Sequence, residues 1–314
     1  MISFLKLIRW PNILIIWMGI SLALFCVINP VLGLNPFESG LNITEFLLLL
    51  ISTTFIAIAG YLQNDLFDIN PDSVNKPGKD LVGRKFRVYI IQILYWVFNI
   101  IGILAGIALS FLLGKINYSL LFLLSAGLLW FYSERYQCQP LIGNIVVAFL
   151  SALTIAIVWL FSFFALTREP MIFTAVQGSF SQLNKLMLIF IGFAFITSLL
   201  REVVKDIEDF KGDDRFGCRT FPVVYGINKA KWLAMLIALF ALAMSVWCQV
   251  FFFKSGYQIL FYGFFLIDLL YLTIAFLLNK SKLSEDYRNI SGLIKLLMVI
   301  GILSMALVYS EHYG

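Results

Sequence analysis

Charged side chains are scarce in this sequence of 314 residues, where Asp, Glu, Lys and Arg together make up only 13%. A soluble globular domain contains about 25% of these residues. Hydrophobic residues make up 61% of the chain, and 31 of them are phenylalanines. This balance excludes a soluble globular domain and predicts an integral membrane protein.

Histidine is almost absent, because His312 near the C-terminal end is the only one. One terminal histidine argues against histidine-based catalysis, zinc sites and haem ligation. The four cysteines, Cys26, Cys138, Cys218 and Cys248, show no spacing typical of metal or redox motifs. We therefore expect all four to be structural thiols.

Nine apolar stretches approach or exceed the roughly 20 residues that a membrane span needs. The expected spans are residues 10–33, 43–63, 88–112, 118–133, 141–166, 185–204, 230–253, 257–279 and 290–311. The first is followed by no apparent small-residue cleavage site, so it resembles a span more than a signal peptide. The fold class predicted is all-α, a multi-pass transmembrane bundle of about nine helices around a central cavity, as a single domain over residues 1–314.

Lys and Arg residues are distributed unevenly between the two sides of these spans. Most lie in the N-terminal segment and in the connections after the second, fourth, sixth and eighth spans. By the positive-inside rule, these connections face the cytoplasm. We expect an inner or cytoplasmic membrane location, with the N-terminus on the cytoplasmic side and the C-terminus on the opposite side.

Two acidic clusters lie on the expected cytoplasmic side, and each contains three aspartates spaced i, i+3 and i+7. They are Asp65, Asp68 and Asp72 after the second span, and Asp206, Asp209 and Asp213 after the sixth. On a helix this spacing puts three carboxylates on one face. They repel one another unless cations compensate. Two such clusters predict a pair of Mg²⁺ ions that clamp a diphosphate.

Basic residues accompany both clusters. Lys76 and Lys79 follow the first, and Arg201 and Lys205 lie beside the second. Mg²⁺ bridges carboxylates to diphosphate oxygens, and basic side chains neutralise the remaining charge. A juxtamembrane loop that is basic only because of topology explains the two lysines equally well. It does not explain why the triple-aspartate pattern occurs twice.

Helix-breaking residues predict where the two acidic helices end. The first is expected to fray near Asn70, and the second to end between Gly212 and Gly217. Glu208 and Asp214 fall off the face that carries the aspartates of the second cluster. We expect their carboxylates to be solvated.

These motifs resemble those of the UbiA superfamily of intramembrane prenyltransferases. Residues 64–72 read Asn-Asp-x-x-Asp-x-x-x-Asp, which is similar to the first motif of that family, and residues 205–226 are similar to the second. Residues 9–12, Arg-Trp-Pro-Asn, resemble its opening Arg-Pro-x-Asn. The second motif is most similar to the digeranylgeranylglyceryl phosphate synthase branch. Residues 75–80 depart from the family pattern, since lysines replace its usual arginines and lose their bidentate geometry.

The resemblance implies a Mg²⁺-dependent prenyltransferase that takes a polyprenyl group from a polyprenyl diphosphate donor. The acceptor is membrane-associated, either a (prenyl)glycerol phosphate hydroxyl in ether-lipid synthesis or an aromatic ring in quinone-type biosynthesis. The six aspartates are the expected metal ligands, and Asn64 assists them. The expected substrate-binding residues are Asn12, Lys76, Lys79, Arg84, Tyr132, Arg135, Arg201 and Lys205. Membrane lipid is a further expected partner, and nucleic acid is not.

Several positions leave alternatives open. Tyr132 and Arg135 could border the active site, or could be an interfacial tyrosine and a topogenic arginine. Asp268 lies within a span, where a charge costs roughly 2.5–3.5 kcal/mol on insertion scales. It could face the cavity, pair with Lys295, or make a protonated contact between helices. A secondary transporter is the rival class, but transporters hold their coupling residues near the bilayer midplane. A lipid-binding scaffold without activity is less consistent with two intact clusters.

Overall fold

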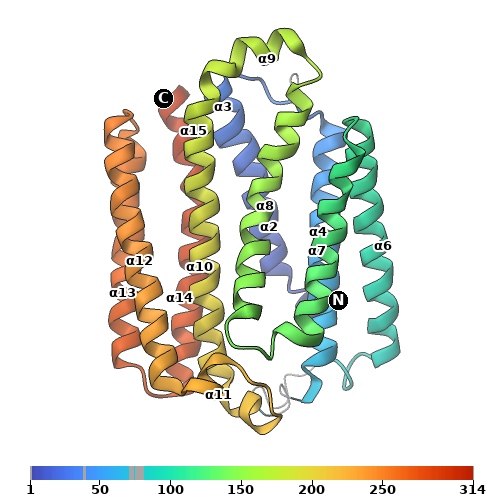
Figure 1. Cartoon of the computed structure of the whole chain (residues 1–314), viewed down its shortest axis with the longest axis vertical. Coiled ribbons are helices and arrows are strands. Elements are labelled where there is room, and N and C mark those ends of the chain that lie inside the picture. Colours follow the sequence, from blue (N-terminus) through green and yellow to red (C-terminus); the bar gives the residue numbers. More distant parts are fainter. Residues whose placement is uncertain (1, 38–39, 71–73, 75–80, 314) are drawn as a thin grey trace.

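The computed structural model describes residues 2–37, 40–70, 74 and 81–313 of the chain. In these residues the fold is a bundle of roughly parallel and antiparallel helices, without a β-strand (Figure 1). The long helices are α4 (Ile43–Phe67), α6 (Val88–Leu112), α7 (Leu120–Phe131), α8 (Ile142–Leu166), α10 (Phe180–Arg215), α12 (Ile227–Lys254), α13 (Gln258–Lys280) and α14 (Ser284–Leu303). The predicted all-α fold class is thereby confirmed.

Shorter helical segments extend or connect the long helices. They are α1 (Ile2–Leu7), α2 (Trp10–Leu22), η1 (Ala23–Ile28), α3 (Asn29–Leu32), η2 (Ile116–Ser119), η3 (Tyr132–Tyr136), α9 (Pro170–Val176), η4 (Gln177–Ser179), α11 (Phe221–Tyr225) and α15 (Met305–Tyr313). The segments η1 and η3 are π-helical turns that continue α2 and α7 without a break. Each therefore lengthens a helix that would otherwise be short for a membrane span.

Nine stretches of the described residues are long and apolar enough to cross a membrane, and each overlaps one predicted span. Most boundaries agree within a few residues. The sixth stretch is the exception, because it covers Pro170–Arg215 where residues 185–204 were expected. Helix α10 continues through the charged second cluster, so that cluster is helical throughout. The protein is an integral, multi-pass membrane protein.

Large apolar side chains cover the outside of the bundle. Leu104 of α6, Phe240 of α12 and Leu269 of α13 are each about three-fifths exposed. Water would solvate such a surface poorly, whereas lipid chains solvate it well. The outward faces of these helices are therefore suited to contact the hydrocarbon part of a bilayer.

Helices α4 and α6 pack closely because a glycine lies at their contact. The Ser52 hydroxyl donates a hydrogen bond of 2.7 Å to the carbonyl oxygen of Gly102. A Cβ atom at Gly102 would lie 2.8 Å from the Ile56 side chain and 3.0 Å from its backbone nitrogen. Small residues allow this close approach of two membrane helices. Gly102 is therefore expected to be intolerant of larger side chains.

Gly102→Ala is expected to lower the free energy of unfolding by about 1–3 kcal/mol, because α4 and α6 must move apart. The measurement is thermal unfolding in detergent. Gly127→Ala is the matched control, since a Cβ atom at this helical glycine meets nothing within 4 Å. It is expected to be neutral or to stabilise by up to about 1 kcal/mol. Equal losses in the two variants would contradict the packing argument.

The C-terminal ends of α4 and α10 lie at the same end of the bundle, together with α11 (Figure 1). Helix α9 lies across the opposite end. Helix α10 ends at Arg215, between the two glycines as predicted. Helix α4 ends at Phe67, earlier than the predicted fraying near Asn70, and Asp68 is its C-cap residue. The fold thus brings both acidic clusters to one end of the molecule.

Candidate active site

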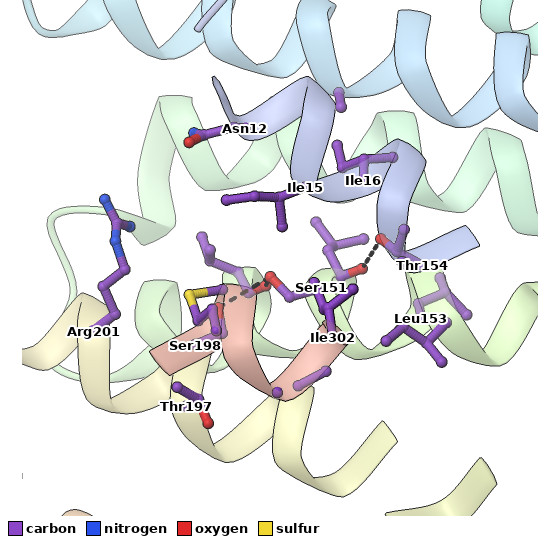
Figure 2. A pocket seen from close by; sticks show the side chains of 18 of the residues that line it. Asn12, Ile15, Ile16, Ser151, Leu153, Thr154, Thr197, Ser198, Arg201 and Ile302 are labelled. Atoms are coloured by element: carbon purple, nitrogen blue, oxygen red, sulfur yellow. Dashed lines mark hydrogen bonds between the residues drawn. The ribbon is translucent and has the colours of Figure 1, made fainter. Parts of the chain in front are cut away.

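A cavity of about 290 Å³ lies inside the bundle, lined by α2, α4, α7, α8, α10, α13, α14 and α15. Its lining changes in character along α10. Phe190 and Phe193 contribute apolar surface, Thr197 and Ser198 contribute hydroxyl groups, and Arg201 and Lys205 contribute charge. Figure 2 shows Arg201 and Asn12 on one side of the pocket, with Leu153 and Ile16 toward the other. The cavity can therefore hold an amphipathic molecule with an anionic head and an apolar tail.

The two acidic clusters meet next to the charged end of the cavity, although none of their described aspartates is among the residues that line it. Asp68 follows α4, and its carboxylate interacts electrostatically with that of Asp213 on α10. Asp209 and Lys205 interact with the same Asp213 carboxylate. Asp206 interacts with Asp213 and Lys205 in turn. The structure therefore brings aspartates of both clusters together, as the sequence predicted, while Asp72 lies outside the described residues.

Neutral side chains donate hydrogen bonds to these carboxylates. The Asn144 Nδ2 group donates to Asp206 over 2.9 Å, and the Thr220 hydroxyl donates to Asp213 over 3.2 Å. Asp68 accepts hydrogen bonds from the amide groups of Gln137, at 2.5 Å, and Asn64. Such donors fix the orientation of the carboxylates and favour their ionised form. Gln137 was not predicted as a site residue, because no local motif points to it.

Asp65 forms an ion pair that joins the first cluster to the N-terminal segment. The Arg9 guanidinium lies 2.6 Å from its Oδ1 atom and 5.0 Å from the centroid of the Tyr61 ring. Burial lowers the pKa of Arg9, but the attraction of the Asp65 carboxylate outweighs this effect and the pKa is raised. Arg9 holds a left-handed backbone conformation, with φ of 51°, between α1 and α2. That conformation directs the first residue of the opening motif toward the first cluster.

The donor chemistry of this end fits Mg²⁺, which prefers oxygen ligands. Carboxylates of both clusters supply such oxygens, and the buried Gln137 Oε1 atom beside Asp68 has no hydrogen-bond partner. An unpartnered buried oxygen is costly unless a ligand satisfies it. Among the described residues, no three carboxylates lie close enough together to form a metal-coordination site. The six-aspartate ligand set therefore stays a prediction.

The predicted substrate-binding residues divide into two groups. Asn12, Tyr132, Arg201 and Lys205 line the cavity, and so does Asn64. Arg84 and Arg135 are exposed and are not among the residues that line it. Lys76 and Lys79 lie outside the described residues.

Glu202 also lines the cavity, although the sequence analysis did not single it out. Its carboxylate is buried and lies 2.6 Å from the Arg201 guanidinium. Glu208 was expected to be solvated, and that expectation is wrong. Its carboxylate lies 2.9 Å from Arg288 of α14, because Glu208 faces that neighbouring helix. Asp214 is exposed, as predicted.

The expectation of four free thiols is corrected by a disulfide bond between Cys138 and Cys218. Cys138 lies between η3 and α8, and Cys218 lies between α10 and α11. Their Cα atoms are 4.6 Å apart, although 80 positions separate them in sequence. Sequence spacing could not predict this pair, since it depends on how α8 and α10 pack. Cys26 and Cys248 are free.

Reduction of this disulfide is expected to lower the free energy of unfolding by up to about 4 kcal/mol, because the 80-residue loop gains freedom in the unfolded chain. The measurement is thermal unfolding in detergent with and without a thiol reductant. The reductant should not affect the Cys138→Ser/Cys218→Ser variant. An equal shift in wild type and variant would show that the reductant acts elsewhere. Cys26→Ala is the control for loss of an unpaired thiol.

Asp268 and Lys295 do not pair with each other, because each has another partner. The alternative of an ion pair between them is therefore excluded. The Gln249 amide donates a hydrogen bond of 2.7 Å to the buried Asp268 carboxylate. This contact joins α12 to α13, and neither Gln249 nor Asp268 is among the residues that line the cavity. Lys295 lines the cavity, and its Nζ atom donates to Asn12 Oδ1 over 2.6 Å.

The sequence is similar to those of known prenyltransferases. A sequence model described as the UbiA prenyltransferase family matches residues 34–299. A digeranylgeranylglyceryl phosphate synthase from Sulfurisphaera tokodaii is 33% identical over 234 residues, which are 74% of each chain. A second enzyme of that name, from Methanosphaera stadtmanae, is 25% identical over 296 residues, or 87% of this chain and 99% of the other.

Solved structures show the same fold. A structure described as digeranylgeranylglyceryl phosphate synthase in membranes superposes with a TM-score of 0.64 and 23% identity, over 98% of each chain. A UbiA homolog from Archaeoglobus fulgidus bound to DMAPP and Mg²⁺ superposes with a TM-score of 0.60 and 14% identity, over 98% of this chain and 99% of that one.

Proposed function

The chain belongs to the UbiA prenyltransferase family, and we propose that it joins a polyprenyl group to the hydroxyl of a prenylated glycerol phosphate, as a step of ether-lipid synthesis. The observation that carries this proposal is the cavity, which has basic residues at one end, next to the paired aspartate clusters, and an aromatic and aliphatic lining beyond them. The relatives named digeranylgeranylglyceryl phosphate synthase support the choice of acceptor. The structure of a homolog with DMAPP and Mg²⁺ supports a metal-dependent reaction on an allylic diphosphate.

The donor is positioned by the change in polarity along the cavity. Its diphosphate lies at the end where Lys205 lines the cavity, next to Asp68 and the aspartates of α10, and its tail extends past Thr197 toward Phe190 and Phe193. Bound Mg²⁺ supplies positive charge that stabilises the leaving diphosphate. The aspartates of both clusters would hold it, and Gln137 would offer an additional oxygen. Lys205 neutralises part of the remaining negative charge.

The reaction exchanges one bond at C1 of the donor. The C1–O bond to the diphosphate breaks, and the diphosphate leaves with the electron pair. The acceptor hydroxyl forms the new C–O bond and releases its proton. Tyr132 and the apolar lining shield the allylic carbon from water, and aromatic faces stabilise positive charge there. The product is an ether.

We also infer that the active site faces the cytoplasm. The distribution of basic residues supports this orientation, because most Lys and Arg residues that the structure describes flank the end at which α4 and α10 terminate. The N-terminal segment reaches the same end, since Arg9 pairs with Asp65. Labelling of an engineered cysteine at an exposed residue such as Asp214, with an impermeant reagent on sealed right-side-out cells, tests this orientation. Labelling before permeabilisation would contradict it.

Product analysis tests the acceptor. Purified protein with a labelled polyprenyl diphosphate, Mg²⁺ and equal concentrations of a prenylated glycerol phosphate and an aromatic acid is expected to yield the ether lipid as its main product. The reason is that the cavity provides basic groups for a phosphate beside the donor site. A prenylated aromatic as the dominant product would contradict the acceptor but would agree with membership of the family.

A further inference from the structure

Lys295 is a cation placed deep in an apolar helix. It lies about three turns into α14, or about 16 Å beyond the helix start at Ser284. Its side chain lines the cavity and donates a hydrogen bond of 2.6 Å to Asn12 Oδ1 on α2. A lysine within a span costs roughly 2.5–3.5 kcal/mol on insertion scales. A neutral donor could make the same hydrogen bond, so the hydrogen bond alone does not account for the charge.

The other cations of the cavity have carboxylate partners. Arg9 pairs with Asp65, Arg201 pairs with Glu202, and Lys205 interacts with Glu202 and Asp209. Among the residues that the structure describes, none supplies a carboxylate to Lys295. The charged groups that act on its ammonium are the guanidinium groups of Arg201 and Arg9, and both are positive. Positive charge therefore accumulates at this point.

We propose that Lys295, oriented by Asn12 and assisted by Arg201, binds the phosphate of the acceptor and makes the enzyme specific for a lipid phosphate. The inference rests on the proposed function and deepens it. An anion between Lys295 and Arg201 removes the repulsion between them and compensates both desolvated charges. The site lies within the cavity, so a lipid can reach it without leaving the apolar part of the bundle.

The position of this site separates it from that of the donor diphosphate. Arg201 lies two turns before Asp209 on α10, or about 12 Å deeper along the helix. Lys295 interacts with Arg201 and Arg9, whereas Asp213 of the second cluster interacts with Lys205, Asp209 and Asp68. Arg9 lies between the two sites, because it also pairs with Asp65. The donor's C1 atom extends from its diphosphate toward Arg201. In a prenylated glycerol phosphate, the phosphate and the free hydroxyl are on adjacent carbons, so a phosphate at Lys295 holds that hydroxyl near C1.

Substitution of Lys295 tests this assignment, because KM can be measured separately for the acceptor and for the donor. Lys295→Met is expected to raise KM for the prenylated glycerol phosphate by at least about tenfold, with KM for the polyprenyl diphosphate changed less than about twofold. With prenylglycerol, which lacks the phosphate, wild type and Lys295→Met should react at similar, low rates. Lys295→Arg should retain part of the affinity. Lys185→Met, at an exposed lysine of the same cavity-lining helix α10, is the control and should behave as wild type.

Three outcomes would overturn the inference alone. An equal loss with both acceptors would show that Lys295 only holds α2 against α14. A rise confined to KM of the donor would place the diphosphate at Lys295. Equal binding of the prenylated glycerol phosphate by wild type and Lys295→Met, measured by calorimetry without donor or Mg²⁺, would show that the phosphate lies elsewhere. This binding experiment needs no turnover, so it separates failure of the inference from failure of the proposed function. Wild-type protein that binds no glycerol phosphate would overturn both.

Discussion

Prenyl transfer is expected to fall below detection when EDTA removes divalent cations, and to return when Mg²⁺ is added in excess. The aspartates that meet at the ends of α4 and α10 repel both one another and a diphosphate. Without a cation the donor head group cannot bind beside these carboxylates. Release of labelled diphosphate and formation of the prenylated product measure the effect.

Thermal unfolding of the same samples is the control for metal removal. The bundle is held together mainly by apolar packing within the membrane-spanning helices, so its melting temperature should change little in EDTA. Turnover that persists in EDTA would contradict a reaction that depends on metal. Loss of both activity and folded structure would instead assign the cation a structural role.

Asp206→Asn is expected to lower kcat/KM on the order of 10³-fold, as removal of a group that stabilises charge in a transition state commonly does. Asparagine keeps the shape of the side chain, and its carbonyl can still accept the hydrogen bond from Asn144. The variant therefore loses a charge without losing a contact. Steady-state kinetics at saturating Mg²⁺ measures the loss, and increasing the Mg²⁺ concentration should restore only part of it.

Asp214→Asn is the matched control, because Asp214 lies on the same helix and is exposed. It should change kcat/KM less than about twofold, since surface charges contribute little. Similar losses in the two variants would show that the charge of the helix end matters and that the face on which a carboxylate lies does not.

Periodicity and spacing predicted the parts of this protein that depend on local sequence. Long apolar stretches predicted nine spans, and the i, i+3, i+7 spacing predicted which carboxylates of α10 share a face. Both signals arise within one element. Gly212 and Gly217 likewise predicted the end of α10, because the residues that end a helix lie next to it.

Contacts between distant elements could not be predicted in this way. The ion pair of Arg9 with Asp65, the hydrogen bond of Gln137 to Asp68 and that of Lys295 to Asn12 each join two helices or their ends. No repeat or spacing encodes such a pair, since it depends on how the helices pack. Arg84 and Arg135 are exposed and do not line the cavity, so their role in substrate binding stays a prediction. The single-domain assignment over residues 1–314 stays a prediction.

The disulfide bond makes a covalent ring of α8, α9 and α10. The long helices α8 and α10 are joined at one end by the chain through α9, and at the other end by the bond from Cys138 to Cys218. Between the two ends, Ser151 of α8 and Ser198 of α10 are hydrogen-bonded at 3.0 Å, as Figure 2 shows. Proteolytic cleavage near α9 would therefore leave two fragments that separate only on reduction. While the ring is closed, the links at both ends limit how far α8 and α10 can separate, so the gaps between other helices are the freer route for a lipid tail that enters the cavity sideways.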